Sequence, residues 1–300
     1  MTSMPIHNRD RISQYDIPED WYANRSLGLS AFIRIKDEER WIGPCVESIL
    51  DFFDEIVVTI DKGTIDRTVD ILASFQSPKI KMFYYPFKIN AGIVPEDSVN
   101  SGAYYTNWSI SKTSFSHVSQ WDADMIMLPS FKKYKEFILR KNMLRFSGYD
   151  IATPDFKYIA KSDRSDSPRY RRLCDIRIYR VNKHLFYRGN KKLYLSQIKE
   201  KPDRCSFQPM CERFTYYSNL IDILDPRLWL KYPHPQLQHI WNVIARKDFA
   251  FPKPIYLHTK PLKQHKTWSG KDMTTERGKD IPVEVPSFVF KLPEAYLNED

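Results

Sequence analysis

The sequence has little of what marks several classes of protein. Glycine occurs only 9 times in 300 residues, which excludes collagen-like and glycine-rich linker architectures. The four cysteines form neither a C-x-x-C pair nor a zinc-finger spacing, so reduced thiols are expected. The apolar runs are short, as at 29–33 and 56–60, and none approaches the roughly 20 residues of a transmembrane helix.

The beginning of the chain carries no sign of secretion. The segment MTSMPIHNRDR lacks the apolar stretch of a cleaved signal peptide. We therefore expect a cytoplasmic protein, either free or bound peripherally at a membrane surface.

The chain has enough apolar residues for a core and an excess of positive charge. Hydrophobic residues make up 42%, and 46 Lys and Arg against 37 Asp and Glu give a net charge of +9. Residues 157–192 hold twelve Lys and Arg against three Asp, so this stretch alone carries +9. Such an excess suits an anionic partner: a nucleic acid, a phosphorylated substrate or a membrane surface.

Strand and helix patterns alternate through the first half of the chain. Residues 1–26 show no sustained period and form an N-terminal arm, whereas 27–148 alternate regularly. Strands are predicted at 27–35, 55–60, 79–85 and 117–121, and helices from Asp37 to Phe53, at 68–75, at 102–116 and from Pro129 to Phe146. This order predicts an α/β fold with a mostly parallel sheet flanked by helices. Strands at 150–160 and 173–181 begin a basic second half, 149–260, and an irregular tail follows at 261–300.

Charged side chains stand where the predicted parallel strands end. Arg34 and Lys36 close the first strand, Asp61 the second, and Asp122 and Asp124 the fourth. Ligands bind at the carboxyl ends of the strands in such sheets, where these residues should meet. Two carboxylates one residue apart can bind a divalent cation, which would neutralise a diphosphate.

The segment 30–75 resembles the nucleotide-binding start of family 2 glycosyltransferases, which have the Rossmann-like GT-A fold. KDEE (36–39) corresponds to their K/R-N-E-E turn, and Ser48-Ile49-Leu50 to the end of the following helix. DKGTIDRT (61–68) corresponds to their D-x-G-S-T-D-x-T loop. Asp37 stands where Asn is usual, and Thr64 where Ser is common.

A further match extends the resemblance to residues 28–130. Family members place an Arg-Asn pair on a helix, with the Asn 15 residues before the first Asp of the D-x-D motif. Asn107 lies 15 residues before Asp122, with Thr106 in place of the Arg. The resemblance implies that 27–148 binds a nucleotide sugar and that 149–260 forms the acceptor side of the same domain.

The resemblance also implies roles for individual residues. Asp61 would bind the base or ribose, with Lys62 where a second Asp is common, and Arg34 would lie beside the base or diphosphate. Lys36, Asn107 and Asp122 complete the expected nucleotide-sugar site. The metal, Mn²⁺ or Mg²⁺, would be held by Asp122, Asp124 and a late histidine, His258.

The implied reaction is transfer of a sugar from a UDP- or GDP-linked donor to a hydroxyl of a glycan or similar acceptor, with inversion. Inversion requires a carboxylate to take the proton of the acceptor hydroxyl. Glu212 is the first choice among the acids at 203–225. An anionic acceptor would meet the basic patch of Arg171, Arg172 and Arg177.

Two other functions fit parts of the sequence. The basic and aromatic stretch 157–192 could bind single-stranded nucleic acid, with a structural D-x-D, although no nucleic-acid-binding motif accompanies it. A sugar nucleotidyltransferase also combines an α/β sheet, paired Asp residues and a metal. Asp61 itself could simply shape a turn.

Overall fold

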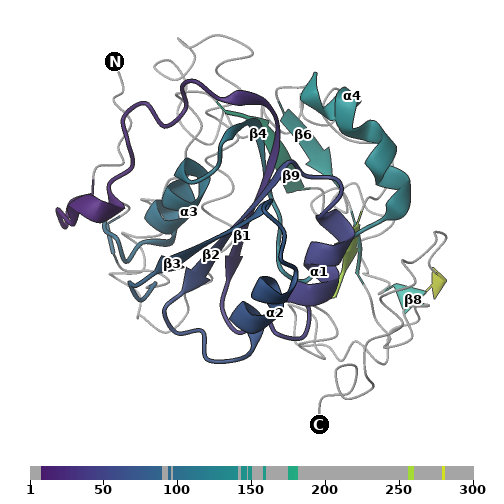
Figure 1. The fold of residues 1–300 in the computed structure, drawn as a ribbon, viewed down its shortest axis with the longest axis horizontal. Helices are drawn as coiled ribbons and strands as arrows, with labels where there is room; N and C mark the ends of the chain where they lie inside the picture. Colours follow the sequence, from purple (N-terminus) through teal and green to yellow (C-terminus); the bar gives the residue numbers. More distant parts are fainter. Residues whose placement is uncertain are drawn as a thin grey trace, which may run out of the picture.

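The computed structural model describes residues 8–89, 94–95, 97–140, 143–146, 148–150, 158–159, 175–181, 256–259 and 279–280. Its main sheet has six strands in the order β3-β2-β1-β4-β9-β6 (Figure 1). The first four are parallel, and β9 pairs antiparallel with both of its neighbours, β4 and β6. The predicted α/β class with a mostly parallel sheet is confirmed. The strands are β1 (Ser26–Ile35), β2 (Glu55–Asp61), β3 (Ile80–Tyr85), β4 (Phe115–Gln120), β6 (Met143–Phe146) and β9 (Asp175–Arg180).

Two smaller sheets accompany the main one. β10 pairs antiparallel with β5 and parallel with β7, and β11 pairs antiparallel with β8. These strands join segments more than 100 residues apart in the chain. They are β5 (Met125–Met127), β7 (Gly148–Asp150), β8 (Tyr158–Ile159), β10 (Tyr256–His258) and β11 (Lys279–Asp280).

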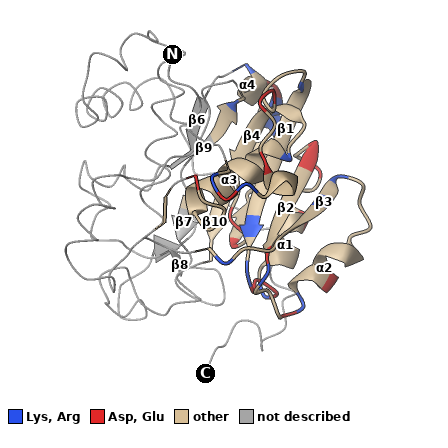
Figure 2. Cartoon of the chain, turned by 90° about the vertical axis from the view of Figure 1, so that its left-hand side faces the viewer, with Lys and Arg blue, Asp and Glu red and all other residues tan. Residues whose placement is uncertain are grey.

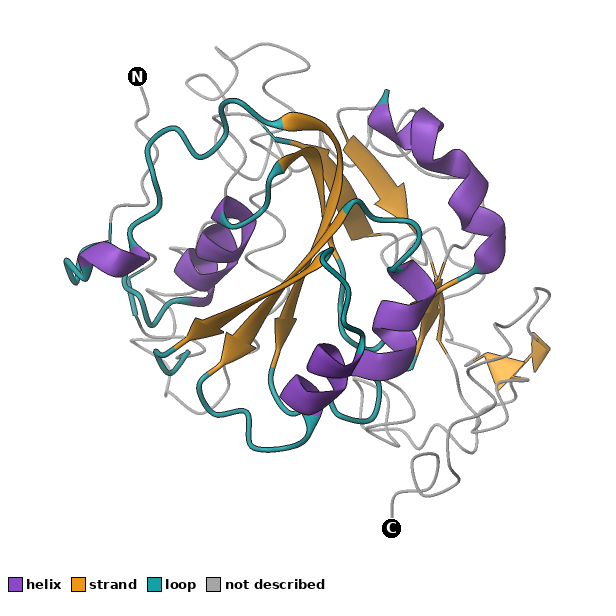
Figure 3. Cartoon of the chain, in the orientation of Figure 1, coloured by secondary structure: helices purple, strands orange, loops and turns teal. Residues whose placement is uncertain are grey.

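Helices cover both faces of the main sheet. α1 and α2 lie on one side and α3 on the other (Figures 1 and 3). None of the helices in the described ranges is both long enough and apolar enough to span a bilayer. The helices are η1 (Ser13–Tyr15), α1 (Ile42–Ile49), α2 (Thr68–Ser74), α3 (Gly102–Ser111), η2 (Pro129–Tyr134) and α4 (Lys135–Leu139).

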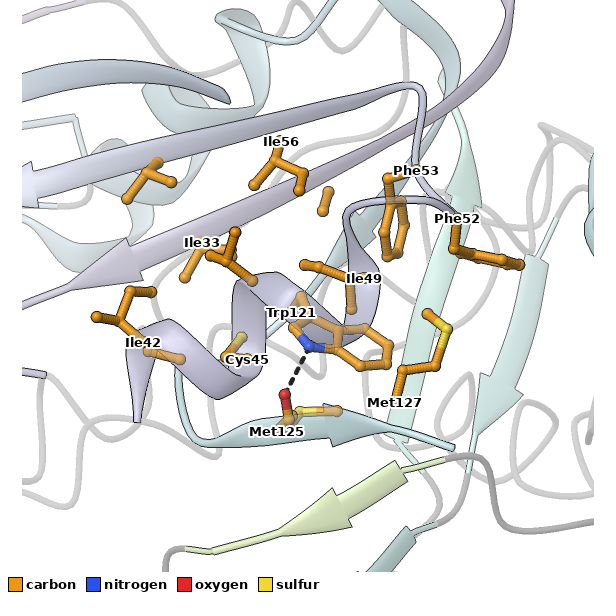
Figure 4. Close-up of a cluster of buried hydrophobic side chains, with 14 of the residues drawn as sticks. Ile33, Ile42, Cys45, Ile49, Phe52, Phe53, Ile56, Trp121, Met125 and Met127 are labelled. Atoms are coloured by element: carbon orange, nitrogen blue, oxygen red, sulfur yellow. Dashed lines mark hydrogen bonds between the residues drawn. The ribbon is translucent and has the colours of Figure 1, made fainter. Parts of the chain in front are cut away.

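Alternation along the strands separates the two faces. In β1, Ile33 and Ile35 belong to the core beneath α1, whereas Arg34 reaches the α3 side. This core centres on Trp121, which packs on Phe53 and whose indole N–H donates to the carbonyl of Met125 at 3.0 Å (Figure 4). The strand period therefore places charged groups on the α3 side at the end of β1.

A second, aromatic core lies on the α3 side and includes the N-terminal arm. The ring of Tyr15 packs on Phe87 and Trp108, and its carbonyl accepts from the hydroxyl of Tyr104 at 2.6 Å. Further along the arm, Trp21 is buried. The arm is thus part of the domain.

Polar contacts join the strands at the amino-terminal end of the sheet. Glu55 of β2 is buried and accepts from the side chains of Ser30, Lys81 and Ser114 and from the backbone of Ser114. Burial alone would raise its pKa, but the Lys81 ammonium and the hydroxyl and backbone donors lower it below its ordinary value. A charged Glu55 therefore ties the four parallel strands together.

Three predicted helices were wrong in extent. Asp37 does not cap α1, because this helix begins only at Ile42. The backbone of Asp37 has a φ of 52°, a left-handed conformation that Asp tolerates better than most residues. The helix predicted over 102–116 ends at Ser111, and β4 starts at Phe115.

The helix predicted from Pro129 to Phe146 instead divides into η2, α4 and β6. Its last segment pairs with β9, as in Met143 opposite Tyr179, so long-range pairing overrides the local helical pattern.

Candidate functional site

The turn after β1 and the loop after β2 are hydrogen-bonded to one another. Asp37 Oδ1 accepts from the backbone N–H of Ile65 at 2.8 Å, and Glu39 Oε2 accepts from that of Arg67 at 3.0 Å. In the other direction, the N–H of Glu39 donates to Asp66 Oδ2 at 2.9 Å. The two sequence motifs therefore form one unit, in which side chains of each motif accept hydrogen bonds from backbone N–H groups of the other.

Asp66 is the centre of this unit. Besides Glu39, its carboxylate accepts from the backbone and the hydroxyl of Thr68, and that hydroxyl in turn accepts from the N–H of Glu38 at 2.8 Å. Partial burial opposes ionisation, but the Thr68 hydroxyl and the backbone donors lower the pKa of Asp66 overall. Asp66 thus holds the start of α2 against the preceding turn.

Asp61 stands at the exit of β2, beside the residues of this loop. Its Oδ1 accepts from the N–H of Gly63 at 2.7 Å, so Asp61 does shape the turn. A carboxylate has further acceptor positions, and among the described residues no other side-chain hydrogen bond involves Asp61. A Cβ on Gly63 would lie 3.6 Å from Lys36 Nζ, which places the ammonium next to this loop. Lys62 is exposed.

Arg34 and α3 meet on the other side of the same strand ends. Arg34 Nη1 donates to Thr106 Oγ1 at 2.7 Å, and the Tyr105 hydroxyl donates to the carbonyl of Thr59 at 2.7 Å. Burial raises the pKa of Tyr105 to about 12; the nearby charge of Arg34 lowers this pKa, and the charge of Asp61 raises it. Arg34 and Asp61 therefore both lie close enough to influence one buried phenol.

The D-x-D motif occupies the connection between β4 and β5. The N–H of Trp121 donates to the carbonyl of Phe32 at 3.1 Å, which continues the β1–β4 pairing and places Asp122 near the end of β1. The Asp122 carbonyl accepts from the N–H of Met125 at 3.0 Å, closing a turn. The motif thus lies on the same edge of the sheet as Asp61.

β10 brings His258 to this motif. His258 pairs with Met125 across the small sheet, and its Nε2 lies 3.7 Å from Asp124 Oδ1. Thr259 fixes the backbone there, because its N–H and its hydroxyl donate to the carbonyl of Asp124 at 2.9 and 3.0 Å. The sequence separation between these partners is 135 residues.

The Asp124–His258 pair has a spacing that a cation could bridge. Ligand atoms about 2.0–2.2 Å from one ion lie roughly 3–4 Å from each other, and the observed 3.7 Å falls in that range. Among the described residues, no three His, Cys, Asp or Glu side chains are arranged to hold a metal ion. A cation held by Asp124 and His258 would need further ligands, such as the phosphate oxygens and waters that commonly complete the coordination of Mg²⁺.

Cys45 of α1 lies between the two parts of the edge. It is fully buried and its Sγ lies 3.5 Å from the carbonyl of Asp122, to which it donates. Burial, and then the charges of Asp124, Asp122 and Glu38, raise the pKa of this thiol well above its ordinary value. The charges of these three carboxylates therefore act on Cys45, and Figure 2 shows Lys and Arg together with Asp and Glu residues on the loops near α1 and α2.

The structure brings some of the predicted site residues together, and others lie outside the part of the chain that it describes. Arg34 and Asp61 lie close to Tyr105, and Asp124 and His258 lie close to one another; Asn107 is buried in α3. Glu212, Arg171 and Arg172 lie outside the described residues, and Arg177 lies in β9, where only its backbone is described.

Two contacts of the site were missed from the sequence. These are the Thr106 hydroxyl on Arg34 and the Thr259 bonds to Asp124. Strand alternation could have placed Arg34 on the α3 side, because Ile33 and Ile35 face the other core. No local pattern could have joined Thr259 to Asp124.

Comparisons with known proteins give partial structural likenesses only. No family model matches the chain, and no curated protein matches it. A crystal structure of glucosyl-3-phosphoglycerate synthase from Mycobacterium tuberculosis with Mn²⁺, UDP and phosphoglyceric acid is similar at 16% identity and a TM-score of 0.36, over 56% of this chain and 59% of that one. A complex of the same enzyme with Mg²⁺ and UDP is similar at 16% identity and a TM-score of 0.36, over 56% of this chain and 60% of that one.

A structure described as a mycobacterial protein gives 19% identity and a TM-score of 0.31, over 44% of this chain and 43% of that one. The present chain thus spans about half the length of these proteins, from 43% to 60%.

Proposed function

We propose that the chain is a metal-dependent glycosyltransferase that moves a sugar from a nucleotide-diphosphate donor to a hydroxyl acceptor. The observation that carries the proposal is the convergence of two motif elements on one sheet edge: Asp61 with its interlocked loop, and Asp124 with His258. Residues 27–148 would bind the donor, and 149–260 would form the acceptor side.

The donor would lie across the ends of β1, β2 and β4. Asp61 would accept hydrogen bonds from the base or ribose, and Arg34 would bind the diphosphate. Arg34 forms no ion pair with any described carboxylate, and its fork of N–H groups matches phosphate oxygens. Lys36, Lys62 and Asn107 would complete this site.

The metal, Mn²⁺ or Mg²⁺, would be held by Asp124 and His258, with Asp122 as a direct or water-mediated ligand. When bound, it would neutralise the diphosphate and make it a better leaving group. Thr259 keeps Asp124 in place through its backbone, independently of the carboxylate. The oxygen of the acceptor hydroxyl would attack the anomeric carbon as the bond to the diphosphate oxygen breaks, with inversion. Glu212 is the candidate base for the hydroxyl proton.

The acceptor would be a glycan or another hydroxyl compound, and an anionic one suits the chain best. This follows from the net charge of +9 in residues 157–192, which include Arg171, Arg172 and Arg177.

Thermal unfolding with nucleotides and metals tests the proposal. UDP, GDP and their sugar conjugates are added with and without Mn²⁺, beginning with UDP and Mn²⁺. A ligand at about 100 times its Kd adds about 2.7 kcal/mol to the free energy of unfolding. We expect stabilisation only when nucleotide and metal are both present.

Two Asp→Asn variants make the test specific. Asp124→Asn keeps the backbone bonds to Thr259 and should lose the metal-dependent part of the stabilisation. Asp51→Asn changes an exposed carboxylate that pairs with Lys132 and should retain it. Metal-independent, salt-sensitive binding of oligonucleotides would instead support the nucleic-acid alternative, and release of pyrophosphate from NTP and sugar phosphate would support the nucleotidyltransferase.

A further inference from the structure

Thr106 is fully buried in α3, and its hydroxyl has two partners. The hydroxyl proton is committed to the carbonyl of Gly102, one turn earlier, at 2.7 Å. The oxygen accepts from Arg34 Nη1, also at 2.7 Å. Because the first bond fixes the rotation of the hydroxyl, its lone pairs are held toward the guanidinium of Arg34.

Arg34 has donors to spare after this contact. A guanidinium has five N–H groups, and Thr106 takes one of them. Arg34 is only partly buried, and within the described ranges it makes no other side-chain hydrogen bond and no ion pair. A cation in this situation can give two parallel N–H groups to a phosphate, provided that its orientation is fixed.

α3 itself is fixed to the sheet on both sides of Thr106. Tyr105 donates to the carbonyl of Thr59, and Ser109 shares a hydrogen bond of 2.8 Å with the hydroxyl of Thr59. On its other side, Tyr104 donates to the carbonyl of Tyr15 in the N-terminal arm. The helix therefore presents Thr106 to β1 from a rigid position.

We propose that Thr106 is a positioning residue that holds the guanidinium of Arg34 for the diphosphate of the nucleotide donor. The inference rests on the proposed function, since it assigns the orientation of one cation in that donor site. It predicts that the Thr106 hydroxyl contributes to nucleotide affinity without touching the nucleotide.

The chain contains a matched control for this hydroxyl. Thr113 also donates to a backbone carbonyl, that of Ile110 at 2.6 Å, and also accepts from an arginine Nη1, that of Arg25 at 2.9 Å. Arg25 also donates to the carbonyl of Phe115 at the start of β4, so this pair lies at the opposite end of the sheet. Thr106→Val and Thr113→Val thus remove the same two kinds of hydrogen bond at two places.

The test measures the Kd of UDP with Mn²⁺ by calorimetry, or of GDP if the wild-type chain binds that nucleotide instead. Thr106→Val should weaken binding about 10-fold, which corresponds to about 1.4 kcal/mol. Thr113→Val should stay within about 2-fold of the wild type, and Thr106→Ser, which restores the hydroxyl, should regain most of the affinity.

A second pair of variants covers the case in which Thr106→Val folds poorly. Arg34→Lys removes the planar fork but keeps the charge, and it should also weaken UDP binding. Thr106→Ala, which also removes the hydroxyl, then takes the place of Thr106→Val. If Thr106 acts through Arg34, adding Thr106→Ala to Arg34→Lys should change the Kd less than 2-fold further, and a larger additional loss would overturn the positioning role.

The outcomes separate the two proposals. If the wild-type chain binds no nucleotide with metal, the proposed function fails and this inference fails with it. If the wild type binds but Thr106→Val binds equally well, or Thr106→Ser is as weak as Thr106→Val, only the positioning role is overturned.

Discussion

Replacing Asp66 by Ala tests whether the two motif loops depend on each other. The substitution removes a carboxylate that accepts from the N–H of Glu39 at 2.9 Å and from the N–H and hydroxyl of Thr68. It leaves the apolar core untouched, because Asp66 is only half-buried and lies on the loop. The effect should therefore come from the lost acceptor alone.

The magnitude follows from these three bonds. Hydrogen bonds to a charged group contribute about 1.5–3 kcal/mol each when shielded from water, and less at a site that water can reach. Because water can replace some of these hydrogen bonds around Asp66, we expect the free energy of unfolding to fall by about 2 kcal/mol. This is near the upper end of the range for replacing a helix N-cap residue by Ala.

The dependence on pH has a definite sign. The pKa of Asp66 is lowered by its donors, so its contribution is complete above its ordinary pKa and is lost as the pH falls through the folded-state value. The difference between wild type and Asp66→Ala should therefore be largest near pH 7 and smaller near pH 3, below the ordinary pKa of Asp.

Urea denaturation at these two pH values provides the assay, and Asp70→Ala provides the control. Asp70 is an exposed carboxylate in the first turn of the same helix, where it adds only a favourable interaction with the helix dipole, about 0.3–1 kcal/mol. The interlocking argument is refuted if Asp66→Ala costs no more than Asp70→Ala at pH 7. It is also refuted if UDP affinity is unchanged in Asp66→Ala.

Two further substitutions test the sheet that carries the site. Gly148→Ala would bring a Cβ to 2.1 Å from the Tyr256 ring, which packs on Trp121. We therefore expect β10 to shift, the free energy of unfolding to fall by about 1–3 kcal/mol and Mn²⁺-dependent UDP binding to weaken. Equal Mn²⁺ titrations of the variant and the wild type would contradict this. Glu55→Gln should lower the free energy of unfolding by about 2–4 kcal/mol near pH 7, measured by urea denaturation, and by less near pH 3. The reason is that the pKa of Glu55 is lowered in the folded state, so the stabilisation by its charge is lost as the pH falls. A loss that is the same at both pH values would show that the charge is unimportant.

The parallel strands were predictable because each signal is local. The runs at β1, β2 and β3 are apolar, short and bounded by loops, and alternation with helices leaves a parallel sheet as the natural result. The expected start of α1 at Asp37 failed for a different reason. Asp favours both helix caps and left-handed turns, and only the bond from the N–H of Ile65, 28 residues away, selects the turn here.

The site was predictable only as far as strand ends locate it. Asp61 and the D-x-D motif follow strands directly, so the sheet edge brings them together. The partner of Asp124 depends on β10, whose residues pair with β5 residues 129 to 133 positions earlier in the chain, and such pairing leaves no local pattern in either segment. His258 was named from resemblance, and the structure places it beside Asp124.

Asp37 and Lys62 both differ from the residues that are usual in the glycosyltransferase family that the sequence resembles, and the hydrogen bonds of the loops indicate which of the two differences would change ligand binding. Asp37 uses a side-chain oxygen to accept from Ile65 and adopts a left-handed φ, and Asn could do both, so the Asp at this position preserves the turn. Lys62 is different. It is exposed, and its backbone N–H donates to the Tyr85 carbonyl at 2.9 Å, whereas no hydrogen bond of its side chain is found within the described ranges. A cation in place of a second carboxylate therefore alters what the edge can bind without altering its shape. Within the proposed donor site, Lys62 rather than Asp37 is where selectivity for the nucleotide should have changed.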